Sequence, residues 1–177
     1  MRFPQSDKLG LTCVFEGLVP GQLHPDGRRY LPLIVLRPAG APAPIGVVDR
    51  HHRVDPALEG REGVAKLVFL LSSVRLQEGR PRQGLAAEEG LAPGRASTVP
   101  TAYGRVLAVP AWEAEREHLP YEALYTELLL DIGVGVIGVR TSVTAASLAE
   151  TIGKSQLEPG DWIEVRRSRI DILSFAT

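Results

Sequence analysis

Residues 125–143, YTELLLDIGVGVIGVRTSV, decide the fold of this chain. Tyr125–Ile132 is apolar and suited to a strand, and a glycine-rich turn then interrupts it. Val136–Val143 follows with β-branched residues, which favour a second strand. Further along, Thr144 can cap a short helix over Ala145–Ile152. The order of strand, turn, strand and helix predicts a mainly β unit in this part of the chain.

The rest of the chain predicts further strands, separated by turn signals. We expect strands over Leu9–Val19, Arg28–Arg37, Ile45–Arg53 and Tyr103–Trp112. Val64–Leu76 predicts a long strand or a hairpin, with a buried helix as the alternative, because periodicity alone does not separate them. Trp162–Phe175 predicts one long strand or two joined strands. Asp55 and Pro56 predict a short helix over Pro56–Glu59, because aspartate caps helices and proline fits their first position. Pro32 lies inside an expected strand, where it lacks the N–H that a ladder needs, so we expect an edge or a bulge there.

Composition predicts a globular protein with two parts. Hydrophobic residues make up 44% of the 177 residues and charged residues 23%, which is typical of folded domains. Residues 77–100 are rich in Gly, Ala and Pro and lack an apolar period, so we expect a linker there between domains at 1–76 and 101–177. The formal net charge is −1, which gives no overall preference for a polyanion.

Two features bear on where the protein is found. The chain has one cysteine, Cys13, which therefore has no partner for an internal disulfide. No stretch reaches about 18 uninterrupted apolar residues, so no membrane-spanning helix is expected. The simplest expectation is a cytoplasmic protein without a membrane partner.

The two parts share an order of elements that predicts an internal duplication. Tyr30–Leu36 corresponds to Tyr125–Asp131 at an offset of 95 residues, and Ile45–Val47 corresponds to Ile137–Val139 at an offset of 92. The alternative is a single mixed or all-β domain in which such matches arise by chance, because glycine and aliphatic residues are common.

Three strands, a helix and two further strands make up the order of the oligonucleotide/oligosaccharide-binding (OB) fold, which the second part resembles. The segment Leu157–Val165 is similar to the turn into the fourth strand of that fold. The resemblance implies a mainly β fold class, with two small OB-like Greek-key barrels in tandem and one short helix in each. It is a likeness of topology, and topology alone carries no function.

Catalytic and metal signatures are weak in this sequence. Asp49, His51, His52 and Asp55 are close together, but neighbouring histidines in a strand point to opposite faces, so a surface strand is favoured over a metal site. Residues 133–138 match the Gly-x-Gly-x-x-Gly dinucleotide pattern, but a strand is expected after them where that motif needs a helix. We therefore predict a non-catalytic protein without a cofactor or a metal.

The densest basic cluster suggests a binding site for nucleic acid. If a hairpin turns within Trp162–Phe175, these arginines lie in the loop between the fourth and fifth strands, where barrels of the OB type commonly hold single strands. Arg105, Tyr125 and Arg140 are expected on nearby strands. The predicted nucleic-acid-binding residues are Arg105, Tyr125, Arg140, Arg166, Arg167 and Arg169.

The main function expected from these residues is binding of single-stranded DNA or RNA. The alternative is an assembly scaffold whose barrels bind a protein partner or form a homo-oligomer, and salt-bridged surface arginines are the simplest explanation of the cluster. Trp162 opens the last strand region, and we expect its ring to pack into the core, because tryptophan usually buries most of its surface.

Limited proteolysis tests the predicted linker. Trypsin is expected to cut first at Arg80, Arg82 or Arg95, because exposed segments with small and polar residues are preferred sites of nicking. Mass spectrometry of the earliest fragments identifies the site. First cleavage inside residues 64–76 or 125–143 would contradict the division of the chain.

Overall fold

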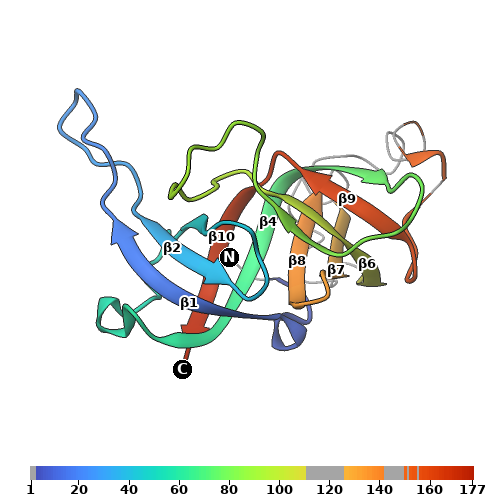
Figure 1. Cartoon of the computed structure of the whole chain (residues 1–177), viewed down its shortest axis with the longest axis horizontal. Coiled ribbons are helices and arrows are strands. Elements are labelled where there is room, and N and C mark those ends of the chain that lie inside the picture. The colour runs from blue at the N-terminus through green and yellow to red at the C-terminus, as the bar shows by residue number, and fades with distance from the viewer. Residues whose placement is uncertain (1–2, 111–125, 142–149, 151, 155) are drawn as a thin grey trace, which may run out of the picture.

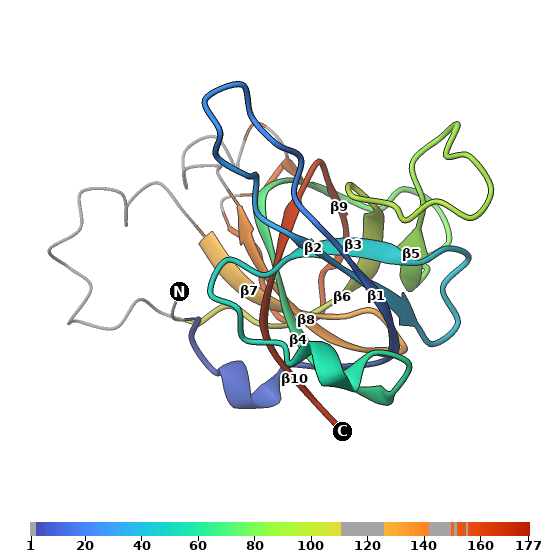
Figure 2. The same ribbon diagram turned by 90° about the vertical axis from the view of Figure 1, so that its left-hand side faces the viewer.

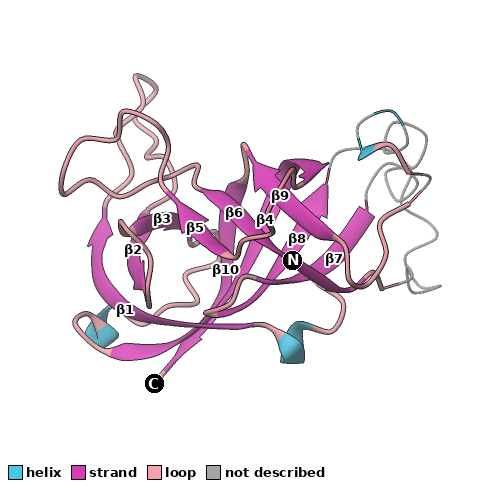
Figure 3. Cartoon of the chain, turned by 45° about the vertical axis from the view of Figure 1, so that its right-hand side comes forward, coloured by secondary structure: helices cyan, strands magenta, loops and turns pink. Residues whose placement is uncertain are grey.

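The computed structural model describes residues 3–110, 126–141, 150, 152–154 and 156–177, and it is mainly β, as predicted (Figures 1 and 3). Two 3₁₀ helices, η1 (Ser6–Lys8) and η2 (Pro56–Leu58), accompany the strands. The strands are β1 (Gly10–Val19), β2 (Leu33–Pro38), β3 (Ile45–Val48), β4 (Glu62–Leu76), β5 (Gly84–Ala86), β6 (Thr101–Ala108), β7 (Thr126–Asp131), β8 (Gly135–Thr141), β9 (Trp162–Arg166) and β10 (Arg169–Ala176).

Strand β4 is the centre of the sheet, because it pairs with four other strands along its length. Its first part is antiparallel to β1 and β10. Its middle, residues 68–72, runs parallel to β8, and residues 73–76 are antiparallel to β9. One 15-residue strand therefore links the strands before residue 77 to those after residue 100.

The strand pairings close two rings that share β4. The first ring runs β1–β2–β3–β10–β4 and returns to β1. The second runs β6–β7–β8–β4–β9 and returns to β6. Each ring contains one parallel contact, β3 with β10 in the first and β8 with β4 in the second. The last strand of the chain thus lies in the ring of the first three strands.

The expected linker holds one short strand. Residues 84–86 form β5, which is antiparallel to the start of β6. Apolar periodicity does not reveal a strand of three residues, so β5 was not predicted. The division of the chain at residues 77–100 remains a prediction.

Apolar side chains from both rings form one continuous core. The apolar strand residues that flank the predicted turns are expected to be buried, and all eight are at most 4% exposed: Leu128, Leu130, Ile137, Val139, Ile163, Val165, Ile170 and Ile172. This prediction is confirmed, because alternation along each strand places every second side chain on the inner face.

A smaller apolar cluster covers part of the outer face. Phe3, Leu9, Val68, Leu70 and Leu129 pack together there. The Phe3 ring occupies the place of a side chain at Gly138, where a Cβ would lie 2.7 Å from two ring carbons. This close approach accounts for one glycine of the 133–138 pattern. That pattern leads into strand β8, so it lacks the helix that a dinucleotide site needs.

Two expected strands are shorter than predicted. Strand β2 begins at Leu33, directly after Pro32, and residues 28–31 lie outside it. Strand β3 ends at Val48, because the buried Asp49 carboxylate accepts backbone N–H bonds from Arg53 at 2.9 Å and Val54 at 3.0 Å. These bonds fold the chain back after β3.

The two expected helices have different outcomes. At Pro56–Leu58 a single 3₁₀ turn forms, with the Asp55 carboxylate accepting from the backbone N–H of Ala57 at 2.9 Å. The expected cap is therefore present on a shorter helix. The helix predicted over Ala145–Ile152 lies mostly outside the described residues, as does its cap Thr144. Within the described part of the chain, no helix is long and apolar enough to cross a membrane.

Truncation of a core side chain tests the inner face. Ile163→Ala removes a fully buried side chain, and we expect it to lower the free energy of unfolding by about 2–5 kcal/mol. Chemical denaturation measures the change. Leu107→Ala is the control, since Leu107 is 45% exposed, and its effect should stay within about 0.5 kcal/mol. Equal effects of the two substitutions would show that the strand faces are misassigned.

Candidate nucleic-acid interface

Strands β6, β9 and β4 present a common outer face in the second ring. Trp162, Glu164 and Arg166 alternate along β9 with the core residues Ile163 and Val165, so they point outward. Register places Tyr103 of β6 and Arg75 of β4 on either side of Glu164.

The same strand register places further residues on this face. Arg105 lies opposite Trp162, and Ser73 lies opposite Arg166. We call the set Arg75, Arg82, Tyr103, Arg105, Trp162, Glu164 and Arg166 the basic-aromatic face.

Glu164 is the acidic centre of the face. It is 8% exposed, and its Oε1 accepts a hydrogen bond from Arg75 Nε at 2.7 Å and forms an ion pair with Arg166. The hydrogen bond to Glu164 raises the pKa of Arg75 above its ordinary value, which keeps the guanidinium charged. One carboxylate therefore fixes the direction of two arginines.

The two aromatic rings of the face have different surroundings. Tyr103 is buried, and the guanidinium carbon of Arg82 lies 3.6 Å from the centre of its ring, a cation–π contact. Trp162 is half-buried and points to the outer face, so the expectation that it packs into the core is wrong. Trp162 points outward because the next residue, Ile163, occupies the inward position, and neighbouring residues of a strand point to opposite faces.

Arg105 is the free cation of the face. It is exposed and makes no ion pair with any described residue. Arg105 and Trp162 are direct partners in the β6–β9 ladder, so their side chains leave the same face of neighbouring strands. This pairing of a cation with an accessible aromatic ring suits a nucleotide, which offers a phosphate and a flat base.

The other predicted arginines lie around Leu70 and the β9–β10 turn. Leu70 of β4 pairs with Arg140 on one side and with Arg169 on the other. Arg140 Nε donates to the buried Glu127 at 2.7 Å, and Arg169 Nε donates to the buried Asp171 at 2.8 Å. Both cations are therefore held by a carboxylate of the chain.

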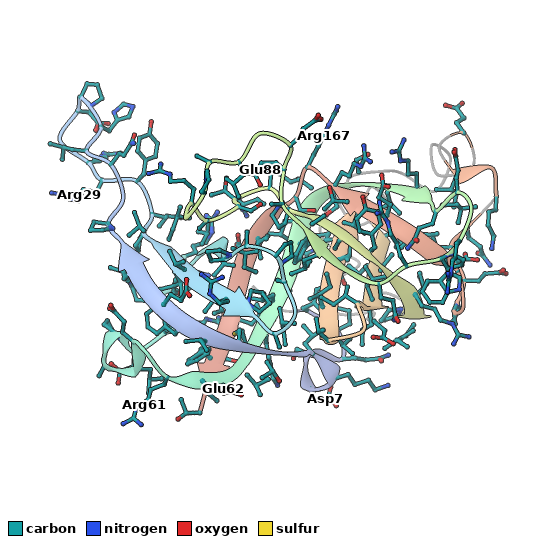
Figure 4. The ribbon with its side chains drawn as sticks, in the orientation of Figure 1. Asp7, Arg29, Arg61, Glu62, Glu88 and Arg167 are labelled. Atoms are coloured by element: carbon teal, nitrogen blue, oxygen red, sulfur yellow. The ribbon has the colours of Figure 1, made fainter. Side chains whose placement is uncertain are left out.

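Arg167 differs from its neighbours in the turn. It is exposed, has a left-handed backbone with φ of 57°, and forms no ion pair with a described residue. Figure 4 shows it at the edge of the molecule, directed away from the ribbon. Tyr125, the remaining predicted site residue, lies outside the described residues.

Of the seven members of the face, sequence reasoning identified Arg105 and Arg166 as site residues. It expected Trp162 in the core, and it missed four others as site residues: Arg75, Arg82, Tyr103 and Glu164. Alternation in residues 73–77 could have placed Arg75 on the outside of β4. The pairing of β4 with β9 could not be deduced, because it depends on which distant strands meet. The cation–π contact of Arg82 comes from a loop whose path has no sequence signal.

Two other places in the chain carry side chains of the kinds that bind metals or react, the histidines at 51 and 52 and the thiol of Cys13. No group of three His, Cys, Asp or Glu side chains suited to a metal occurs in the described parts of the chain, and both His51 and His52 are exposed. Cys13 lines a surface hollow of about 290 Å³ together with Thr12, Arg37 and Glu62. Its side chain is buried, and burial raises the pKa of the thiol to about 11.

In comparisons with known proteins, no family model, no curated protein and no solved structure matches this chain.

The reactivity of Cys13 tests its burial. At pH 8 the folded protein should react with a thiol reagent at least about tenfold more slowly than the denatured protein, because the group is inaccessible and protonated. The folded pKa is raised above the ordinary value of 9.0, so the unfolded chain ionises first. Its contribution to stability is therefore lost as pH rises from 9.0 to about 11. Fast reaction of the folded protein would contradict the buried position.

Proposed function

We propose that this protein is a nucleic-acid-binding module for single strands, with the basic-aromatic face as its contact surface. The observation that carries the proposal is the juxtaposition of Arg105 and Trp162, a free cation opposite an accessible indole ring. Single-strand binding sites combine these two elements, phosphate charge and base stacking.

The charge of the face favours an anionic ligand. Arg75, Arg82, Arg105 and Arg166 outnumber the acids around them, which are Glu164, Glu78 near Arg75 and Asp131 opposite Arg105, in a chain whose formal net charge is −1. Arg167 and Arg169 extend this charge through the turn after β9. A phosphate backbone along β9 would meet successive cations, each of which releases counterions from the nucleic acid.

Strand connectivity supports two OB-like barrels, which is the architecture expected from the sequence. In the first ring β10 takes the place of a fifth strand, parallel to the third strand β3 and antiparallel to the fourth, β4. In the second ring β4 takes that place, parallel to β8 and antiparallel to β9. A closed Greek-key ring of five strands is the plan of the OB fold.

The proposed duplication has support from the place where β4 meets the β9–β10 turn. Leu71 and Arg167 both have a left-handed backbone with φ of 57°, and they are 96 residues apart. The buried hydroxyls of Ser72 and Ser168, at the same offset, lie 2.7 Å apart. Such matched geometry at one offset is what two copies of one unit, each supplying a strand to the other, would produce.

A binding titration tests the proposal. Arg105→Ala with Arg166→Ala is expected to weaken binding of a labelled single-stranded oligonucleotide and to lower the salt slope of log K by about 1.4, since each phosphate contact contributes about 0.7. Trp162→Ala should weaken binding with little change in that slope, because stacking carries no charge. Fluorescence anisotropy at several salt concentrations measures both effects.

The matched control removes the same charge elsewhere. Arg28→Ala with Arg29→Ala alters the β1–β2 loop, on the side of the molecule away from β9 (Figures 1 and 4), and should leave the affinity near that of the parent. Glu164→Gln should strengthen binding, because it removes the carboxylate that pairs with Arg75 and Arg166. Absence of binding by the parent at low salt would refute the proposed function, and equal losses from both arginine pairs would refute the location.

A further inference from the structure

The segment between β4 and β5 is bonded to the second ring at both of its ends. We call residues 77–83 the strap; it leads from the end of β4 into β5, which pairs with β6 (Figure 2). At its start, the backbone N–H of Gln77 donates to the carbonyl of Trp162 in β9 at 2.9 Å. At its end, Gln83 Nε2 donates to the carbonyl of Asp131 in β7 at 3.1 Å. The strap is therefore fixed against β9 at one end and against β7 at the other.

The Gln77 side chain closes the strap on itself. Its Oε1 accepts a hydrogen bond from the backbone N–H of Arg82 at 2.9 Å, and its Nε2 donates to the carbonyl of Arg82 at 2.9 Å. The same Nε2 donates to the carbonyl of Ile163 in β9, also at 2.9 Å. One carboxamide thus satisfies both backbone groups of Arg82 and anchors that residue to β9.

This anchoring places the Arg82 side chain on the ring of Tyr103. The guanidinium carbon lies 3.6 Å from the ring centre. Tyr103 points to the outer side of β6, because its neighbour Ala102 belongs to the core. The tyrosine is nevertheless only 8% exposed, whereas Arg82 is exposed. Neither face of the tyrosine ring is therefore open to a base, and the side chain that solvent meets at this place is the arginine.

The edge of the Arg82 guanidinium is open for a ligand. Stacking on a ring uses the flat face of a guanidinium and leaves its N–H donors free around the edge. Among the described residues, no side chain or carbonyl accepts a hydrogen bond from this guanidinium, and Glu164, the partner of Tyr103 in the ladder, forms its ion pairs with Arg75 and Arg166. Such an edge suits a phosphate, which it can bind through two parallel N–H bonds.

We propose that Arg82 binds a phosphate of the single strand, and that Gln77 is the positioning residue that holds it on Tyr103 for this contact. The inference rests on the proposed function and divides the roles of the two rings in the basic-aromatic face. Trp162 is the ring on which a base stacks, whereas Tyr103 supports a cation. Because the guanidinium is already oriented in the free protein, the contact loses less side-chain entropy when the phosphate binds.

The position of Arg82 can be measured on the full chain without a ligand. Protons held over the face of an aromatic ring resonate upfield, so the side-chain protons of Arg82 should show this shift in the NMR spectrum of the parent. Gln77→Ala should remove the shift. Gln83→Ala is the matched control, because it removes a carboxamide of the same strap that bonds Asp131 and not Arg82. A parent without the shift, a shift that persists in Gln77→Ala, or equal losses in both variants would overturn the role of Gln77.

A titration with a labelled oligodeoxythymidylate at several salt concentrations tests the phosphate contact. Arg82→Ala should lower the salt slope of log K by about 0.7, which corresponds to about fivefold weaker binding at about 0.1 M salt. Arg80→Ala is the matched control: Arg80 is an exposed cation of the same strap, and no described residue holds its side chain in place. Its substitution should leave the slope near that of the parent, and an effect equal to that of Arg82→Ala would contradict a positioned contact.

Combining the two substitutions separates positioning from general stability. Gln77→Ala should weaken binding in the parent but add nothing in the Arg82→Ala background, because it acts through Arg82. Equal losses in both backgrounds would mean that Gln77 has only a structural role. Stronger binding by Arg82→Ala would show that the arginine blocks a base platform on Tyr103, and would overturn the proposal.

The outcomes distinguish this inference from the proposed function. If the parent binds and Arg82→Ala keeps the full salt slope, the phosphate contact is refuted and the proposed function stands. If the parent does not bind at low salt, the proposed function is refuted and the phosphate contact with it, and the NMR shift alone then decides whether Gln77 positions Arg82.

Discussion

The structure depends on one strand serving two rings. β4 can do so only if its backbone changes course midway, because its neighbours change from β1 and β10 to β8 and β9. The change occurs at Leu71, whose left-handed conformation is unfavourable for a residue with a Cβ by about 1–2 kcal/mol. Arg167 repeats that conformation across the sheet. Ser72 and Ser168 then satisfy each other's buried hydroxyls at this junction, where water is excluded.

The sequence predicted the parts of this fold that depend on local pattern. The apolar and β-branched runs on either side of the glycine-rich turn in 125–143 identified two strands and the buried residues Leu128, Leu130, Ile137 and Val139. Sequence could not predict that β10 returns to the first ring, because partner choice between distant strands leaves no periodicity. The sequence pattern also predicted a β2 that begins too early, at residue 28. Tyr30 and Leu31 lie before the observed strand, and their side chains are exposed.

Sequence also could not predict the ion pairs of the candidate site. Sequence identified Arg105 and the arginines of residues 166–169, but it could not say which carboxylate each one meets. Arg140, Arg166 and Arg169 each pair with an acid that is nearly buried, namely Glu127, Glu164 and Asp171. Such pairs stabilise the fold little when one partner is exposed. They do hold the guanidinium groups in fixed directions, which reduces the entropy lost when a phosphate binds.

The fold holds the basic-aromatic face in a fixed geometry. Arg105 and Trp162 lie on strands paired on both sides, so their spacing is set by the ladders of the second ring. A repeating polymer requires that constancy, because successive phosphates and bases must meet successive side chains.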